Sequence, residues 1–245
     1  MHFPLYLFLI AAGGLGGFLS GMLGIGGGII MSFEQYPQQY EEWFERNRFA
    51  YESELRAVRM MLPKTGNGLE IGVGSGRFAA PLGIKLGIEP SRAMGDIARQ
   101  RGIKVVDGVA EALPFDDASF DFALMVTTIC FVDNAELALE EACRVLKPGG
   151  CLVIGLIDKE SPLGKFYQMR KNKSIFYGQA TFFSVGEVVS ILKRAGFGDF
   201  RFIQTIFHDP ADMKNVEPVK EGYGEGSFVV IKVVKQERGL QNIHI

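Results

Sequence analysis

Apolar and polar positions follow two different patterns along this chain, and the pattern changes near residue 31. No Asp, Glu, Lys or Arg precedes Glu34, and residues 3–31 are apolar or small. Farther along, charged side chains interrupt short apolar runs throughout. This change predicts an apolar, glycine-rich segment over residues 1–31 and one folded domain over residues 32–245.

The domain alternates short apolar runs with helical spacing. Residues 32–62 have helical periodicity, with aromatic side chains scattered among charges. We expect strands at 69–73, 86–89, 104–107, 120–126 and 151–157, and helices at 91–101 and 134–146. Alternation of strands and helices predicts an α/β fold with a parallel sheet and right-handed crossovers.

The C-terminal part has a different pattern. A helical pattern covers residues 185–195, and two strand patterns follow at 200–207 and 227–235 with no helix between them. The simplest pairing is an antiparallel hairpin at the sheet edge, joined by the long loop 208–226. Lys147 to Gly150 predict a helix stop and a turn before the fifth strand.

Composition and charge narrow the class of protein. The chain has 245 residues, of which 47% are hydrophobic and 22% charged, as is ordinary for a globular protein. Its 26 Lys and Arg against 28 Asp and Glu argue against nucleic acid as the main partner. Cys130, Cys143 and Cys151 form no metal-ligand spacing, so we predict no metal site and a reducing, cytoplasmic compartment.

Candidate chemistry lies in a glycine turn that follows the first strand. Residues 69–78 read Leu-Glu-Ile-Gly-Val-Gly-Ser-Gly-Arg-Phe. The third glycine of a dinucleotide fingerprint would fall at Arg77, and Glu70 would oppose a pyrophosphate. S-adenosylmethionine is cationic and is favoured by nearby acids. Glu89, at the end of the second strand, suits the ribose hydroxyls of either cofactor and does not discriminate between them.

Five stretches together resemble one family. They are residues 69–76, 87–91, 108–115, 119–121 and 144–150. In order and spacing they resemble class I S-adenosylmethionine-dependent methyltransferases, most of all the type 11, ubiquinone-biosynthesis-like branch. The resemblance covers residues 36–235. It implies a Rossmann-like sheet of seven strands, mostly parallel with an antiparallel last strand, and helices on both faces.

The resemblance also implies which residues bind S-adenosylmethionine. They are Glu70, Gly72, Val73, Gly74, Ser75, Gly76, Glu89, Pro90, Ser91, Val109, Ala110, Glu111, Thr127 and Thr128. In this family the glycines let the backbone approach the cofactor, and the residue at Glu89 holds the ribose diol. Many relatives have Asp where Val109 stands, so one polar contact to the adenine is absent here.

The implied function is methyl transfer to a small-molecule acceptor by in-line displacement, which requires alignment but no obligatory base. Three regions are candidates for the acceptor site: the aromatic helix near Tyr36 to Trp43, the insert 158–183, and the loop 208–226. In that loop His208, Tyr223 and Glu225 are the candidate contacts. The alternative is a non-enzymatic S-adenosylmethionine-binding sensor or scaffold tethered to a membrane.

The apolar start has a resemblance of its own. Residues 13–30 resemble the first membrane segment of the sulfite-exporter permease family, and residues 3–30 are long enough to span a bilayer. Three interpretations are open: a membrane anchor that tethers a cytoplasmic enzyme, a remnant of a gene fusion, or upstream sequence wrongly joined to a protein that starts at Met31.

Overall fold

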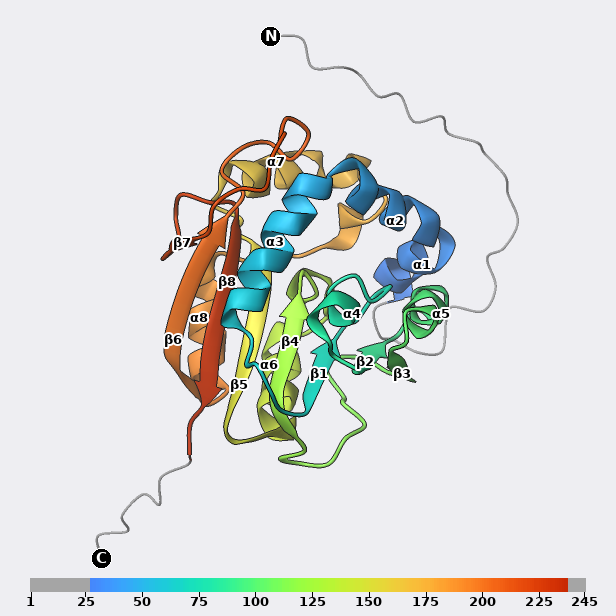
Figure 1. Ribbon diagram of the computed structural model, residues 1–245. Helices are drawn as coiled ribbons and strands as arrows, with labels where there is room; N and C mark the ends of the chain where they lie inside the picture. The colour runs from blue at the N-terminus through green and yellow to red at the C-terminus, as the bar shows by residue number, and fades with distance from the viewer. Residues whose placement is uncertain (1–26, 238–245) are drawn as a thin grey trace, which may run out of the picture.

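The computed structural model describes residues 27–237 of the chain (Figure 1). Most of the predicted apolar segment, with its resemblance to a permease and its predicted anchor, therefore lies outside the described residues. Within residues 27–237, no helix combines the length and apolar character that crossing a bilayer requires.

A central mixed sheet organises the fold. The strands are β1 (Gly68–Ile71), β2 (Leu86–Glu89), β3 (Lys104–Asp107), β4 (Phe120–Val126), β5 (Leu146–Ile157), β6 (Phe197–Thr205), β7 (Lys220–Glu221) and β8 (Phe228–Lys235). Their order in the sheet is β3-β2-β1-β4-β5-β8-β6-β7. Strands β1 to β5 pair in parallel, whereas β8 is antiparallel to both β5 and β6. This confirms the predicted Rossmann-like fold, with the two-residue β7 as an additional strand.

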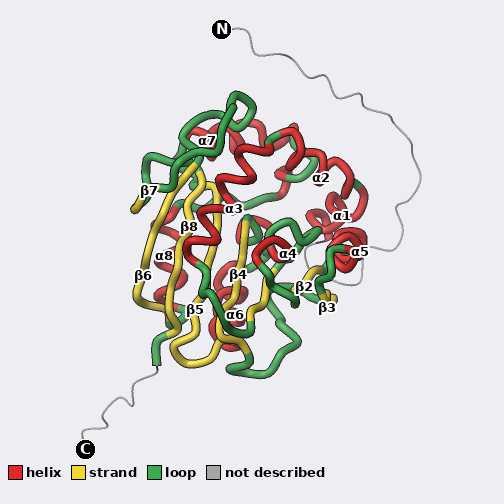
Figure 2. Tube along the Cα trace, in the orientation of Figure 1, coloured by secondary structure: helices red, strands yellow, loops and turns green. Residues whose placement is uncertain are grey.

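Helices cover both faces of the sheet (Figures 1 and 2). The helices are α1 (Gly27–Gln35), α2 (Pro37–Arg46), α3 (Arg48–Met61), α4 (Ala79–Leu82), α5 (Arg92–Gln100), α6 (Ala135–Val145), α7 (Pro162–Arg170) and α8 (Val185–Arg194). Short 3₁₀ turns are η1 (Ile129–Phe131), η2 (Lys171–Lys173) and η3 (Tyr177–Gln179).

Strand β4 shows how the two faces form two cores. Because side chains alternate along a strand, Ala123 and Met125 pack with α6 and α8. Phe122 and Leu124 point to the opposite face and pack with α3. All four side chains are buried, as expected for a central strand covered on both faces.

The region predicted as one helical stretch, residues 32–62, forms three helices. Pro37 begins α2, where its missing N–H costs no hydrogen bond, and Asn47 separates α2 from α3. Helix α1 begins at Gly27 and so crosses the boundary predicted at residue 31. In Figure 1, α1, α2 and α7 lie at the end of the sheet where the parallel strands terminate. They therefore cover the edge at which α/β folds bind ligands.

Two further predictions hold with an added detail each. Helix α6 stops at Val145, and residues 147–150, although continuous with β5, leave the ladder with β4: Leu146 pairs with Phe120 and Cys151 with Phe122, and Gly149 has a φ of +73°. Strands β6 and β8 form the predicted antiparallel hairpin beside β5, and the two-residue β7 adds the outer edge.

Candidate active site

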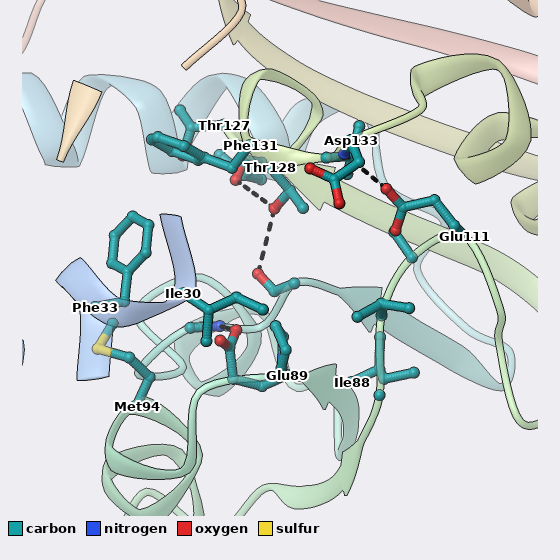
Figure 3. A pocket seen from close by; sticks show the side chains of 18 of the residues that line it. Ile30, Phe33, Ile88, Glu89, Met94, Glu111, Thr127, Thr128, Phe131 and Asp133 are labelled. Carbon is teal, nitrogen blue, oxygen red and sulfur yellow. Dashed lines mark hydrogen bonds between the residues drawn. The ribbon is translucent and has the colours of Figure 1, made fainter. Parts of the chain in front are cut away.

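A cavity opens at the carboxyl ends of β1, β2 and β4, beneath α1; we call it the strand-end cavity (Figure 3). It is lined by Ile30, Phe33, Tyr40, Gly72, Gly74, Ile88, Glu89, Pro90, Met94, Gly108, Val109, Ala110, Glu111, Val126, Thr127, Thr128, Phe131, Val132 and Asp133. The position is a topological switch point, since β1 continues to β2 on one side and pairs with β4 on the other.

The glycine turn forms the floor of this cavity. The amides of Gly72 and Val73 both donate to the Ile88 carbonyl, which ties the turn to the end of β2. Gly72 has a φ of +71°, and a Cβ there would lie 2.4 Å from Thr128 Cγ2. The Thr128 hydroxyl donates to the Gly72 carbonyl at 3.3 Å. Glycine is therefore required for both the backbone conformation and the close approach of Thr128, which follows the end of β4.

Glu89 organises the same turn from β2. Its Oε2 accepts from the Gly74 amide at 2.8 Å, and its Oε1 accepts from the Ser91 amide at 3.0 Å. Burial raises the pKa of this carboxyl to about 7, although the two amide bonds act in the opposite direction. The group is therefore held in place by the backbone while it borders the cavity.

Helix α1 is fastened over the cavity by Glu34. Its Oε2 accepts from the Ser91 hydroxyl at 2.7 Å and from the Ala93 amide at 3.0 Å, at the start of α5. A carboxylate is favoured there because it meets the positive end of the helix. This contact places Ile30 and Phe33 against the cavity, as Figure 3 shows.

Helix α2 is fixed to the back of the glycine turn by Glu41. Its carboxylate accepts from Arg77 Nε at 2.9 Å and from both terminal nitrogens of Arg101. Burial alone would raise the pKa of Glu41, but the bonds from Arg101 and Arg77 hold it at about 2. Arg101 also donates to the Ser75 carbonyl at 2.6 Å. The ion-pair network therefore stabilises the glycine turn on the side away from the cavity.

The electrostatic character of the strand-end cavity is acidic. Among the described residues that line it, Glu89, Glu111 and Asp133 carry carboxylates and none is Lys, Arg or His. Beneath the turn, Glu70 is buried, its Oε2 has no hydrogen-bond partner, and burial raises its pKa well above the ordinary value. The carboxylates that line the cavity suit a cationic ligand and oppose a pyrophosphate, whereas the raised pKa of Glu70 keeps that carboxyl protonated and uncharged at neutral pH.

The structure divides the predicted cofactor residues into two groups. The residues that line the strand-end cavity are Gly72, Gly74, Glu89, Pro90, Val109, Ala110, Glu111, Thr127 and Thr128. The residues that support it from behind are Glu70, Val73, Ser75, Gly76 and Ser91. Glu70 accepts from the Ala79 amide, and the Ser91 hydroxyl caps α5 by accepting from the Met94 amide.

A second and larger cavity adjoins the first; we call it the aromatic cavity. Its volume is about 410 Å³. It is lined by Phe33, Gln39, Tyr40, Glu42, Trp43, Phe44, Arg46, Asn47, Glu54, Phe78, Thr127, Phe131, Ile157, Leu163, Tyr167, Lys173, Ser174, Ile175, Phe176, Tyr177 and Pro210. Phe33, Tyr40, Thr127 and Phe131 also line the strand-end cavity. The two cavities therefore share a wall.

Thr127 marks the junction of the two cavities. It follows the last residue of β4, lines both cavities, and has a φ of +51°, which is rare for a β-branched residue. Its amide donates to the Gly155 carbonyl at 2.7 Å. Backbone strain of this kind costs about 1–3 kcal/mol and is concentrated at functional sites.

All three regions predicted to form the acceptor site contribute to the aromatic cavity, although the loop 208–226 does so only through Pro210. Tyr40 and Trp43 come from α2, and Tyr167, Phe176 and Tyr177 come from the insert after β5. The aromatic rings form an extended contact set, in which Phe33 stacks on Phe176 at 5.2 Å and Tyr167 on Tyr177 at 4.9 Å.

The structure does not bring the three loop candidates to either cavity. The exposed His208 hydrogen-bonds Glu217, Tyr223 packs on Phe202 at 5.1 Å, and Glu225 pairs with Lys220. From the same loop, Pro210 lines the aromatic cavity instead. Contact of His208, Tyr223 or Glu225 with an acceptor stays a prediction, and the cavity geometry does not depend on it.

Comparisons with known proteins agree with this geometry. Residues 69–154 match a family model described as "Methyltransferase domain". A crystallised Thermotoga maritima protein, described as a "SAM-dependent methyltransferase, possible histamine N-methyltransferase", is 55% identical. The similarity covers 85% of this chain and all of that one, with a TM-score of 0.83. This chain belongs to the S-adenosylmethionine-dependent methyltransferases. As a methyltransferase it is an enzyme, and its cofactor is S-adenosylmethionine.

Other relatives of this methyltransferase are less informative about the acceptor. An uncharacterised protein of Methanocaldococcus jannaschii is 49% identical over 203 residues, which is 83% of this chain and 98% of that protein. The 2-methoxy-6-polyprenyl-1,4-benzoquinol methylase of Mus musculus is 29% identical over 164 residues, which is 66% of this chain and 45% of the relative.

Proposed function

We propose that this methyltransferase binds S-adenosylmethionine in the strand-end cavity and transfers its methyl group to a small molecule in the aromatic cavity. The observation that carries the proposal is the shared wall formed by Phe33, Tyr40, Thr127 and Phe131. A reaction by in-line displacement needs two adjoining sites, so that nucleophile and methyl carbon approach without an intervening layer of protein.

The residues of the strand-end cavity fit the cofactor. S-adenosylmethionine supplies a methyl group already activated on a sulfonium, so the protein has to bind, orient and exclude water. In the proposal Glu89 accepts hydrogen bonds from the ribose hydroxyls, and the apolar Val109 and Ala110 contact the adenine. The absence of basic side chains from the described lining agrees with a cationic cofactor.

The aromatic cavity provides the conditions for the acceptor. Its rings exclude water from the reacting atoms, which strengthens electrostatic interactions there. Burial raises the pKa of Tyr40 and Tyr167, so both phenols stay protonated and uncharged at neutral pH. The cavity volume of about 410 Å³ favours a small molecule over a protein or nucleic-acid substrate.

Two relatives point to different acceptors. The Thermotoga maritima neighbour is described as a possible histamine N-methyltransferase, and the Mus musculus relative as a benzoquinol methylase. The first is similar over its whole length at 55% identity, so we favour a small amine. Membership in the ubiquinone-biosynthesis-like branch, cytoplasmic location and a membrane tether stay predictions. The comparisons give no support to a non-enzymatic sensor.

The proposed function is tested by methyl transfer from labelled S-adenosylmethionine to a panel of histamine, other small amines and soluble quinols. We expect label in at least one small molecule. We also expect Phe176→Ala to raise the KM for that acceptor about tenfold, because the ring packs in the aromatic cavity on Phe33. The affinity for S-adenosylhomocysteine should stay within about twofold of wild type, since Phe176 does not line the strand-end cavity.

Phe200→Ala is the matched control, because Phe200 stacks on Phe202 on β6 and lines neither cavity. Its KM should equal that of wild type. Equal KM values for Phe176→Ala and wild type would contradict the placement of the acceptor. Label transferred only to protein would contradict the class of acceptor.

A further inference from the structure

Glu54 is a buried carboxylate in the wall of the aromatic cavity. It lies on the inner face of α3, where 6% of its surface is exposed, and it lines the cavity with the rings of α2, α7 and η3. No hydrogen bond or ion pair joins its side chain to any group in residues 27–237. A buried carboxylate without a partner is costly, because it loses its hydration and gains nothing in return.

The other buried carboxylates of the described chain show what is usual in this protein. Glu70 accepts from the Ala79 amide, and Glu89 accepts from the amides of Gly74 and Ser91. The other two also accept backbone amides: Asp158 from Glu160, and Glu217 from Phe207. Glu54 is the exception among them, so its position is not explained by a structural role in the backbone.

The surroundings of Glu54 consist of aromatic rings. Its charge raises the pKa of the phenols of Tyr40, Tyr167 and Tyr177, in each case after the larger effect of burial, so all three lie near it. Burial raises the pKa of Glu54 itself to about 8. The faces of aromatic rings attract cations, so the carboxylate and the rings favour the same kind of ligand.

We propose that Glu54 binds the positively charged nitrogen of the acceptor, and that the acceptors of this enzyme are small amines. This inference rests on the proposed function, since it assigns the substrate class of the same aromatic cavity. A protonated amine supplies the charge that the buried carboxylate lacks, and it packs against the surrounding rings. A neutral quinol supplies no positive charge and would leave Glu54 without a counter-ion.

Binding of an amine beside Glu54 should release a proton. In the absence of a cation, Glu54 is largely protonated at neutral pH because its pKa is raised to about 8. An ammonium group favours the ionised carboxylate, so binding should expel the proton of Glu54 into the solvent. The other titratable groups around it, Tyr40, Tyr167, Tyr177 and Cys130, are partly buried, and desolvation raises their pKa values, so they stay protonated.

The other charged groups around the aromatic cavity are either exposed to solvent or border the strand-end cavity instead. Glu42 and Arg46 form an exposed ion pair on α2, and Lys173 and Asp209 are exposed. Glu89, with a pKa raised to about 7, borders the neighbouring strand-end cavity. Saturation with S-adenosylhomocysteine holds that cavity in one state. Replacement of Glu54 leaves all these groups in place. A proton that wild type releases and the Glu54 variant does not release therefore comes from Glu54.

The test is calorimetric titration of the full chain, saturated with S-adenosylhomocysteine, with benzylamine and with its neutral counterpart benzyl alcohol. Titrations at pH 7 in two buffers of different ionisation enthalpy count the protons released. For wild type we expect benzylamine to bind at least about tenfold more tightly than benzyl alcohol. We also expect benzylamine to release close to one proton and benzyl alcohol to release none.

Glu54→Gln keeps the shape of the side chain and removes its charge. It should weaken benzylamine at least about tenfold, abolish the proton release and leave benzyl alcohol within about twofold. Glu52→Gln on the same helix is the matched control, because Glu52 pairs with Arg48 at 3.3 Å and lines neither cavity. It should behave as wild type in every titration.

Several results would overturn the assignment. They are equal affinities of wild type for the two probes, no binding of benzylamine, no proton release, and unchanged benzylamine binding in Glu54→Gln. If Glu54→Gln fails to fold, the wild-type protein still tests the assignment through its preference for benzylamine over benzyl alcohol and through the proton release. Binding of S-adenosylhomocysteine is measured first. Its failure would count against the proposed function, whereas its success without a preference for benzylamine would count against Glu54 alone.

Discussion

Replacing Glu89 with alanine is expected to reduce the affinity for S-adenosylhomocysteine about a hundredfold. The change removes the acceptor of two backbone amides, those of Gly74 and Ser91, in the floor of the strand-end cavity. It also removes the carboxylate proposed to accept the ribose hydroxyls. Hydrogen bonds to a charged group contribute about 1.5–3 kcal/mol each. The loss of the two proposed bonds from the ribose hydroxyls, taken at the lower end of this range, corresponds to about a hundredfold. Calorimetric titration measures the affinity.

Two further variants make this measurement specific. Glu136→Ala removes an exposed glutamate that pairs with Arg194 and lines neither cavity, so its affinity should equal that of wild type. Glu89→Gln keeps one acceptor oxygen and should lie between wild type and alanine. An affinity of Glu89→Ala within about threefold of wild type would show that the cofactor does not depend on this carboxylate.

Glu54→Gln is expected to make the unliganded protein more stable at pH 8 by roughly 3 kcal/mol. The pKa of Glu54 is raised from its ordinary value of 4.5 to about 8 by burial. The folded state therefore retains a proton that the unfolded state loses as the pH rises above 4.5. Wild-type stability should accordingly fall between pH 4.5 and 8 through this group. The amide carries no charge to desolvate, so the variant should lack this part of the pH dependence.

Urea unfolding at pH 5 and pH 8 tests this expectation. The advantage of Glu54→Gln over wild type should be small at pH 5 and large at pH 8, while Glu52→Gln should match wild type at both. A variant that is less stable than wild type at pH 8 would indicate a partner for the Glu54 charge. The expected gain in stability at the expense of amine binding is typical of residues retained for function.

The cofactor turn could be predicted from sequence because its signal is local. Gly72 and Gly74 follow a buried strand directly, and Glu89 ends the next strand, so chain order alone places them at one edge of a parallel sheet. The structure brings these three residues together in the strand-end cavity. The residues behind the turn, such as Ser75 and Gly76, share its motif but support it rather than line it.

The position of helix α1 over the strand-end cavity could not be predicted in the same way. Helix α1 begins inside a glycine-rich apolar stretch with no helical pattern of its own. The contact that fixes it, from Glu34 to Ser91 and Ala93, joins residues more than 50 positions apart. Ile30 thereby lines the strand-end cavity, so residues on both sides of position 31 contribute to one site.

Glu54 was missed for a related reason. In the sequence it is one glutamate among several in an amphipathic helix, and nothing nearby distinguishes it from the partly exposed Glu52. Its isolation arises only when α7 and η3, more than 100 residues later, close over α3. Conversely, His208 and Tyr223 lie in a glycine-rich loop, and no partner for either side chain is evident from the sequence. In the folded chain His208 hydrogen-bonds Glu217, and Tyr223 packs on Phe202.

In the proposed mechanism the two adjoining cavities hold the cofactor and a small amine. The most direct measurement is a crystal structure of the full chain with S-adenosylhomocysteine and benzylamine. We predict S-adenosylhomocysteine in the strand-end cavity, with its sulfur beside Thr127. We predict benzylamine in the aromatic cavity, with its nitrogen at hydrogen-bond distance from the Glu54 carboxylate. S-adenosylhomocysteine in the aromatic cavity, or benzylamine with its nitrogen away from Glu54, would contradict the account.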